Sequence, residues 1–211
     1  MAKLRALVKA GVVNSEGFYS VGGRTAVDFA NTIVRLERKE DGLASFEDLL
    51  TFLKAQELLH EDEASSYHMY LFQNPERCDQ VMAQLREIRA KFRQALEQLS
   101  TGWPMDPMFV SEINDQLAGY KTQIRLEPAE EGYSLQTYLT DEGPEQLTYP
   151  ILKDIAGFLA SDQTDKIRQC AADDCQLYFI NTSRNGRRRW CSMSTCGNRA
   201  KVNAYLKRQE A

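Results

Sequence analysis

The chain carries CAADDCQLYFINTSRNGRRRWCSMSTCGNR at residues 170–199, and four of its five cysteines fall within this stretch. Their spacing is C-x4-C-x15-C-x4-C, two close pairs separated by an insert of the length of a β-hairpin. Each pair closes only a small loop, so bringing the four thiols together costs little chain entropy. Structural Zn²⁺ prefers four thiolates in a tetrahedron. The spacing therefore predicts one structural zinc ion held by Cys170, Cys175, Cys191 and Cys196.

Other uses of these cysteines are open at this stage. Disulfides suit a secreted protein, but Lys9 interrupts the apolar run of Met1–Val13 and no small-residue cleavage pattern follows, so a signal peptide is not expected. Free thiols and a catalytic thiol are further alternatives. Iron or an iron–sulfur cluster also accepts four cysteines, and zinc is favoured because no neighbouring residue indicates redox chemistry.

The residues around the cysteines predict the plan of a small module. Leu177–Ile180 and Arg187–Cys191 are expected to form the two strands of a hairpin, joined by the turn-rich segment between them. A helix is expected over Ala200–Arg208, with an inner face formed by Val202, Tyr205 and Leu206. This order is typical of a treble-clef or zinc-ribbon-like fold. About 40 residues with so few apolar side chains depend on the metal for folding free energy.

Upstream of this module the pattern is mainly helical. The strongest apolar periodicity runs from Pro75 to Leu99, at intervals of three and four residues. Further helices are expected within 18–36 and over 46–59, 62–72, 108–120 and 144–160, with Ser45 as the N-cap of the second. Alternating residues at 122–126 and 133–139 predict one β-hairpin. The expected fold is mainly α, with a helical domain over 1–162 and the metal module over 165–211.

Composition sets outer limits on the function. The 211 residues are 43% hydrophobic and 27% charged, enough for one core and a small satellite module. No run reaches the ~18–20 uncharged apolar residues of a membrane span, so a cytoplasmic protein is expected. From Asp165 onward the chain has ten basic and four acidic residues, a net charge of +6. The remainder has 16 basic and 26 acidic residues, a net charge of −10. A basic tail on an acidic body favours a polyanionic partner.

Two patterns in the chain match known families. The module, through its cysteines, Phe179, Thr182–Asn185, Arg188–Met193 and Thr195–Lys201, closely resembles the CGNR zinc finger, named after the tetrapeptide at 196–199. The body resembles the ABATE domain usually found ahead of that finger, on Val27-Asp28-Phe29, Asn31-Thr32 and Arg35. The two resemblances span nearly the whole chain. They imply a bacterial, stress-induced transcription regulator whose finger is proposed to bind DNA.

The basic residues of the module support nucleic-acid binding independently of that resemblance. Arginines on the predicted hairpin and basic residues on the helix could contact phosphates, and a helix start could read a base edge. Alternation places Arg187 and Arg189 on one face and Arg188 on the other. The candidates are Arg184, Arg187, Arg188, Arg189, Asn198, Arg199, Lys201, Lys207 and Arg208. Alternatively, these charges neutralise the zinc thiolates or attach the module to the acidic body. Trp190 is expected to pack in the module rather than to stack on bases.

Four polar residues of the body form a second candidate site. The residues Asp28, Asn31, Thr32 and Arg35 lie at helical spacing, so that Asp28, either Asn31 or Thr32, and Arg35 can share one face. A buried Asp28–Arg35 ion pair is one interpretation, and a pocket for an unidentified small-molecule effector is the other.

Catalysis is not expected. The chain has two histidines, His60 and His68, without a third metal ligand near them, and Cys78 lacks the context of a nucleophile. Glycines 22 and 23 do not make a phosphate loop. The favoured function is a transcription regulator that binds nucleic acid, expected to be DNA, through the zinc finger. The alternative is a protein-interaction adaptor with a purely structural zinc module. The sequence leaves the oligomeric state open.

Overall fold

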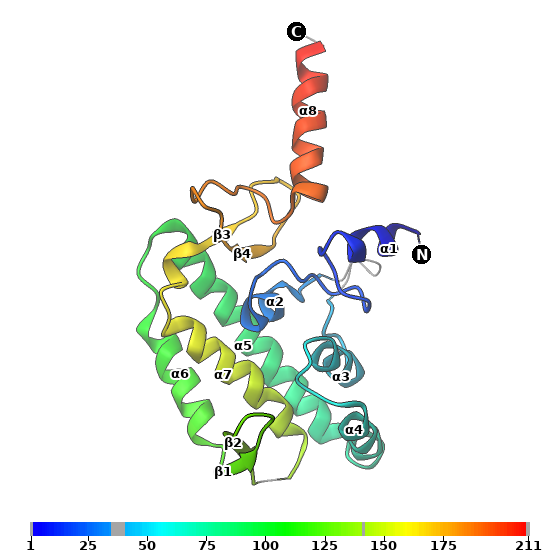
Figure 1. The fold of residues 1–211 in the computed structure, drawn as a ribbon, viewed down its shortest axis with the longest axis vertical. Coiled ribbons are helices and arrows are strands. Elements are labelled where there is room, and N and C mark those ends of the chain that lie inside the picture. The colour runs from blue at the N-terminus through cyan, green and yellow to red at the C-terminus, as the bar shows by residue number, and fades with distance from the viewer. Residues whose placement is uncertain (1, 35–40, 141, 210–211) are drawn as a thin grey trace.

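The computed structural model describes residues 2–34, 41–140 and 142–209. It confirms a mainly helical body followed by a small module that ends in a projecting helix (Figure 1). The α-helices are α1 (Ala2–Lys9), α2 (Thr25–Asn31), α3 (Phe46–Ala55), α4 (Glu61–Gln73), α5 (Pro75–Thr101), α6 (Pro107–Ala118), α7 (Tyr149–Leu159) and α8 (Asn198–Gln209). The strands are β1 (Thr122–Pro128), β2 (Tyr133–Leu139), β3 (Ile167–Gln169) and β4 (Tyr178–Ile180).

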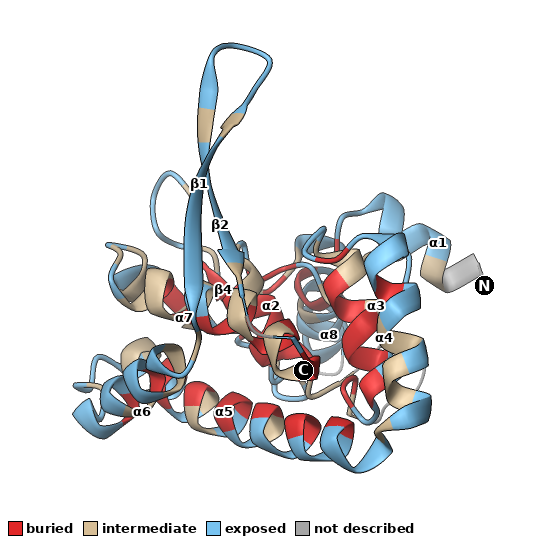
Figure 2. Ribbon diagram, turned by 90° about the horizontal axis from the view of Figure 1, so that it is seen from below, coloured by how far each residue is buried: buried red, intermediate tan, exposed pale blue. Residues whose placement is uncertain are grey.

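Helix α5 forms the long support of the body, as its periodicity predicts. Pro75 occupies its first turn, where no backbone donor is needed, and Gly102 ends it with φ of 79°, a left-handed conformation that favours glycine. One face of α5 is buried along its length and the other faces solvent (Figure 2). The main core lies between that face and α2, α3 and α7.

Two predicted helices have different limits in the structure. The helix expected over 46–59 begins with the predicted cap, because the Ser45 hydroxyl accepts from the Asp48 amide and the Asp48 carboxylate accepts from the Ser45 amide. It ends at Ala55, since the chain turns at Glu57 with φ of 58°. The helix expected over 144–160 begins as a 3₁₀ turn, Pro144–Thr148, and becomes α-helical only from Tyr149. Pro150, in the first turn of α7, allows this restart.

Strands β1 and β2 form the predicted hairpin. They pair in antiparallel register, with Leu126 opposite Leu135 and Ile124 opposite Thr137. Gly132 has φ of 78° in the connecting turn. The hairpin rises away from the helices and is exposed along nearly its whole length (Figure 2).

The predicted hairpin of the C-terminal module is wrong in its pairing. Strand β4 pairs with β3, with Ile167 opposite Ile180, and residues 187–191 do not form a strand. This segment instead crosses the first cysteine pair, where the Ala171 amide donates to the Arg189 carbonyl at 2.8 Å. The reason is the apolar content of each segment: Ile167 and Ile180 enter the main core, whereas residues 187–189 are three arginines that cannot be buried there.

A second, smaller core lies under the cysteines. It combines Leu177 and Phe179 of the module with Val12, Val13 and Val21 from the N-terminal segment. The chain before α2 is thus part of the module's packing.

Helix α8 does not pack on this core as predicted. Val202, Tyr205 and Leu206 were expected to face inward, but they are 56, 57 and 51% exposed, and α8 buries none of its side chains. The helix projects from the module (Figure 1), and no described element buries its apolar residues.

Candidate metal centre and basic surface

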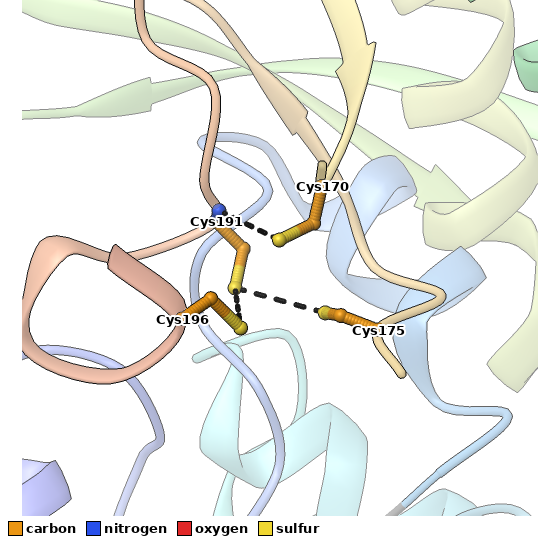
Figure 3. Close-up of side chains that lie close together, drawn as sticks. All are labelled: Cys170, Cys175, Cys191 and Cys196. Carbon is orange, nitrogen blue, oxygen red and sulfur yellow. Dashed lines mark hydrogen bonds between the residues drawn. The ribbon is translucent and has the colours of Figure 1, made fainter. Parts of the chain in front are cut away.

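The four cysteines of the module meet at one point (Figure 3). Cys170 follows β3, Cys175 closes the first pair, Cys191 ends the crossing segment, and Cys196 lies in the short helical turn that leads into α8. Their sulfur atoms all lie within 4.8 Å of one another. The Cys191 sulfur is 3.9 Å from that of Cys175 and 3.6 Å from that of Cys196.

These distances fit a tetrahedral zinc ion. A Zn–S bond of about 2.3 Å places sulfurs about 3.8 Å apart in a regular tetrahedron. The centre is buried on three of its four ligands, with Cys175 half-buried, as expected of a closed structural site. The four cysteines therefore fit one structural zinc ion, as the spacing predicts. Cys78 lies elsewhere, buried in α5.

The pKa values of three of the four thiols are shifted, and in opposite directions. Hydrogen bonds from Cys175 and Cys191 lower the pKa of the Cys170 thiol, and the same bonds raise the pKa of Cys175 and Cys191. The Cys191 amide also donates to the Cys170 sulfur at 3.3 Å. Four adjacent thiolates repel one another, so the cluster becomes fully deprotonated only with a cation at its centre.

Two of the predicted nucleic-acid contacts are engaged inside the module. Arg199 donates through Nη2 to the Cys196 sulfur at 3.1 Å and forms an ion pair with Asp174, and these partners raise its pKa. Arg188 donates to the carbonyls of Trp190 and Cys191, and its guanidinium lies 4.1 Å from the centre of the Phe179 ring. Burial lowers the pKa of Arg188. For Arg199 the contacts agree with the alternative interpretation of the basic residues, in which they neutralise the zinc thiolates.

The other candidates are exposed. Arg187 and Arg189 are exposed on either side of the inward Arg188, an alternation that agrees with the prediction. Arg189 lies 5.5 Å from the ring of Trp190, which packs half-buried against the second core. Asn198 is exposed at the start of α8. Six basic side chains are exposed without an ion pair to any other described residue: Arg184, Arg187, Arg189, Lys201, Lys207 and Arg208.

A polar contact that the sequence did not suggest joins the body to the module. The Asn31 side chain in α2 donates to the Tyr178 carbonyl in β4 at 2.9 Å and accepts from the Tyr178 amide at 2.8 Å. Arg93 of α5 donates to the carbonyls of Ala30 and Gln176, at 2.8 and 2.9 Å, and lies over the Tyr178 ring. No local pattern marks Arg93, because its partners lie 63 and 83 residues away.

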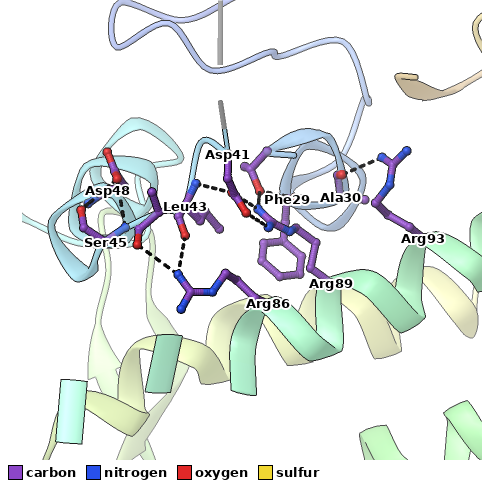
Figure 4. A network of polar contacts seen from close by, with 11 residues as sticks. Phe29, Ala30, Asp41, Leu43, Ser45, Asp48, Arg86, Arg89 and Arg93 are labelled. Carbon is purple, nitrogen blue, oxygen red and sulfur yellow. Dashed lines mark hydrogen bonds and ion pairs between the residues drawn. The ribbon is translucent and has the colours of Figure 1, made fainter. Parts of the chain in front are cut away.

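Two further body candidates, Asp28 and Thr32, are buried in the fold. Asp28 accepts from the Gly22 amide at 2.7 Å, and burial raises the pKa of its carboxyl from 3.8 to about 7. Thr32 donates to the Phe29 carbonyl and accepts from Arg89, whose ion pair with Asp41 is buried on the arginine side (Figure 4). Arg35, the predicted partner of Asp28, lies outside the described residues. An effector pocket at these residues stays a prediction.

Comparisons with known families agree with this arrangement. A model of the CGNR zinc finger matches residues 166–209. A model of the ABATE domain, described as "Putative stress-induced transcription regulator", matches residues 23–162. No curated protein matches the chain. Among the described residues, none of the helices has the length and apolar character needed to cross a membrane.

Proposed function

The chain belongs to the ABATE family and carries a CGNR zinc finger, and on that premise we propose that it regulates transcription by binding DNA through the exposed basic residues of the finger. In this proposal residues 165–211 contact the DNA, and residues 1–162 carry and orient the finger.

The observation that carries the proposal is the unpaired basic surface of the finger. Six arginine and lysine side chains are exposed on it, and none forms an ion pair with another described residue. They occupy the loop of Arg184–Arg189 and helix α8, which lie at the same end of the molecule (Figure 1). Phosphates supply the counter-charges that the protein does not, and each neutralised phosphate releases counterions.

The shape of α8 suits a DNA groove. The helix has 12 residues, about 18 Å of length, and projects away from the module (Figure 1). The major groove of B-DNA admits one α-helix. An isolated helix of this length is marginally stable in water, so a partner that covers it also stabilises it. In this proposal Asn198, at the exposed start of the helix, donates to a base edge or a phosphate.

In this proposal Arg188 and Arg199 do not contact the DNA. Both donate to groups of the metal module, and Arg199 also pairs with Asp174. We assign them to the support of the finger rather than to the contact with DNA. The contact set is then Arg184, Arg187, Arg189, Asn198, Lys201, Lys207 and Arg208.

The test is binding of the zinc-loaded full chain to mixed genomic duplex fragments across a salt series. The variant Arg187→Gln/Arg189→Gln removes two exposed charges from the finger. We expect its plot of log K against log salt to be shallower by about 2, because each lost phosphate contact reduces the slope by about 0.9. The matched control, Arg125→Gln/Lys153→Gln, removes two exposed charges from the body and should retain the wild-type slope.

Two results would overturn the proposal. One is the absence of binding at low salt, which leaves the finger as a structural zinc module in a protein-interaction adaptor. The other is an equal loss of slope in both double variants, which would make the binding a property of overall charge.

A further inference from the structure

The β1–β2 hairpin has an apolar face that nothing in the described chain covers. Ile124, Leu126, Tyr133 and Leu135 are 64, 64, 71 and 69% exposed. The register places Leu126 opposite Leu135, so these side chains form one continuous surface. Among the described residues no third strand joins this sheet. A two-stranded hairpin is marginally stable alone in water and needs a packing partner for its apolar face.

The two faces of the hairpin differ sharply in chemistry. The opposite face carries Arg125, Glu127 and Tyr138, which satisfy one another: the Tyr138 hydroxyl donates to Glu127 at 2.7 Å, and Arg125 lies 5.0 Å from the Tyr138 ring centre. The apolar face has no charged residue at any of its eight positions, Thr122, Ile124, Leu126, Pro128, Tyr133, Leu135, Thr137 and Leu139. Only that face therefore lacks a partner.

We propose that this apolar face is a dimerisation surface, on which the same face of a second copy of the chain packs. A two-fold symmetric contact must be self-complementary, because residue i of one copy contacts residue j of the other and residue j contacts residue i. A face with eight uncharged positions buries no charge in such a contact, whereas the opposite face would have to remove Arg125 and Glu127 from water.

The exposed area, if fully buried, reaches the lower limit of a specific dimer interface. Taking about 200 Å² for a large apolar residue, the four exposed side chains offer about 500 Å² on each copy. Two copies would then bury about 1,000 Å², the lower limit of a specific interface. Two small sheets pack face to face about 10 Å apart, which allows the leucine and tyrosine side chains to interdigitate.

The position of the hairpin permits this contact. It projects beyond the helices (Figure 2), so two hairpins can stack without a collision between the bodies. In Figure 1 the hairpin and helix α8 lie at opposite ends of the molecule. A dimer formed through the hairpins leaves both zinc modules free.

The experiment measures the mass of the full zinc-loaded chain by sedimentation equilibrium between about 1 and 200 µM. We expect a weak dimer, with a dissociation constant on the order of micromolar, because weak and transient interfaces lie at this lower size limit. Leu126→Lys/Leu135→Lys places two charges at the centre of the face, and we expect the dissociation constant to rise at least 100-fold. The matched control, Gln123→Lys/Gln136→Lys, adds the same charges to the opposite face and should leave it within threefold of wild type.

A second measurement does not depend on the fold of a variant. In wild-type protein mixed from isotope-labelled and unlabelled chains, we expect contacts between the methyl groups of Leu126 or Leu135 of one copy and the Tyr133 ring of the other. A wild-type chain that stays monomeric throughout the concentration range would overturn the proposal, and would leave the face to a different protein. So would a dimer that survives Leu126→Lys/Leu135→Lys, or one without these contacts.

Discussion

The side chain of Asn31 forms two hydrogen bonds with the backbone of Tyr178, one as donor at 2.9 Å and one as acceptor at 2.8 Å. Both residues are buried, and 147 positions separate them. Asn31 ends α2 of the body, and Tyr178 begins β4 of the zinc module. The amide thus completes the edge of β4 much as a neighbouring strand would, and it couples the module to the body.

We expect Asn31→Asp to destabilise the whole chain by about 2–4 kcal/mol at pH 7, because the carboxylate cannot donate to the Tyr178 carbonyl and is buried facing it. Urea unfolding followed by far-ultraviolet circular dichroism measures this change. Asn114→Asp, on an exposed position of α6, should change the free energy of unfolding by less than about 0.5 kcal/mol. Equal effects of the two substitutions would show that the Asn31 contact contributes no more to the free energy of unfolding than a typical surface residue.

Zinc removal should loosen the module selectively. We expect one zinc ion per chain in the wild type and none in Cys191→Ser, measured by elemental analysis. Hydrogen exchange should then become faster in residues 170–177 and 181–197 but stay slow in α5, β3 and β4, because Ile167, Tyr178 and Ile180 belong to the main core. The control Cys78→Ser lies in α5 and should retain its zinc. Retention of zinc by Cys191→Ser would contradict the four-cysteine site.

Asp28 should make stability depend on pH. Its carboxyl has a pKa of about 7 in the folded protein, raised from 3.8 mainly by burial. Between these values the folded state holds a proton that the unfolded state has released. Stability from this group is therefore greatest near pH 4 and falls by about 1.4 kcal/mol per pH unit towards pH 7, for a total of up to about 4 kcal/mol.

Asp28→Asn should remove this dependence, because its amide oxygen still accepts from the Gly22 amide but carries no charge. The difference in free energy of unfolding between variant and wild type should shift in favour of the variant as the pH rises from 4 to 8. Parallel curves would show that Asp28 does not titrate in this range. Asp79→Asn, an exposed change on α5, is the control and should follow the wild type.

The features that the sequence predicted correctly depend on local spacing. Each of these features, the cysteine pattern, the periodicity of α5, the Ser45 cap and the first hairpin, depends on residues that lie near one another in the sequence. The contacts of the site could not be predicted in this way, because the partners of its arginines lie far away in the sequence and form no recognisable pattern. Arg93 reaches Ala30 and Gln176, and Arg199 reaches Asp174, 25 positions away.

The two wrong predictions in the module have a common cause. The return strand 187–191 and the inner face of α8 were both assigned from the sequence of the module alone. In the structure Val12, Val13 and Val21 of the N-terminal segment complete the core under the cysteines, and α8 buries none of its side chains. Periodicity identifies an apolar face but not which distant segment packs on it.

Arg199 and Lys201 allow the metal and nucleic-acid roles to be separated. Arg199 contacts the Cys196 sulfur, whereas Lys201, two positions later, is exposed and has no ion pair with a described residue. We expect Arg199→Gln to weaken zinc binding about 10–100-fold in competition with a chelator, as the loss of a group behind a metal ligand generally does. Lys201→Gln should leave zinc affinity unchanged.

When DNA binding is measured with zinc in excess, Lys201→Gln rather than Arg199→Gln should be the variant that is affected. Lys201→Gln should reduce the salt dependence of DNA binding by about one phosphate contact, whereas Arg199→Gln should retain the wild-type slope. If Arg199→Gln lost the slope while its zinc affinity stayed normal, the guanidinium would be a DNA contact, and its bond to Cys196 would only position it for that role. If both variants lost zinc, the module would depend on the total charge of α8 rather than on the Arg199–Cys196 contact.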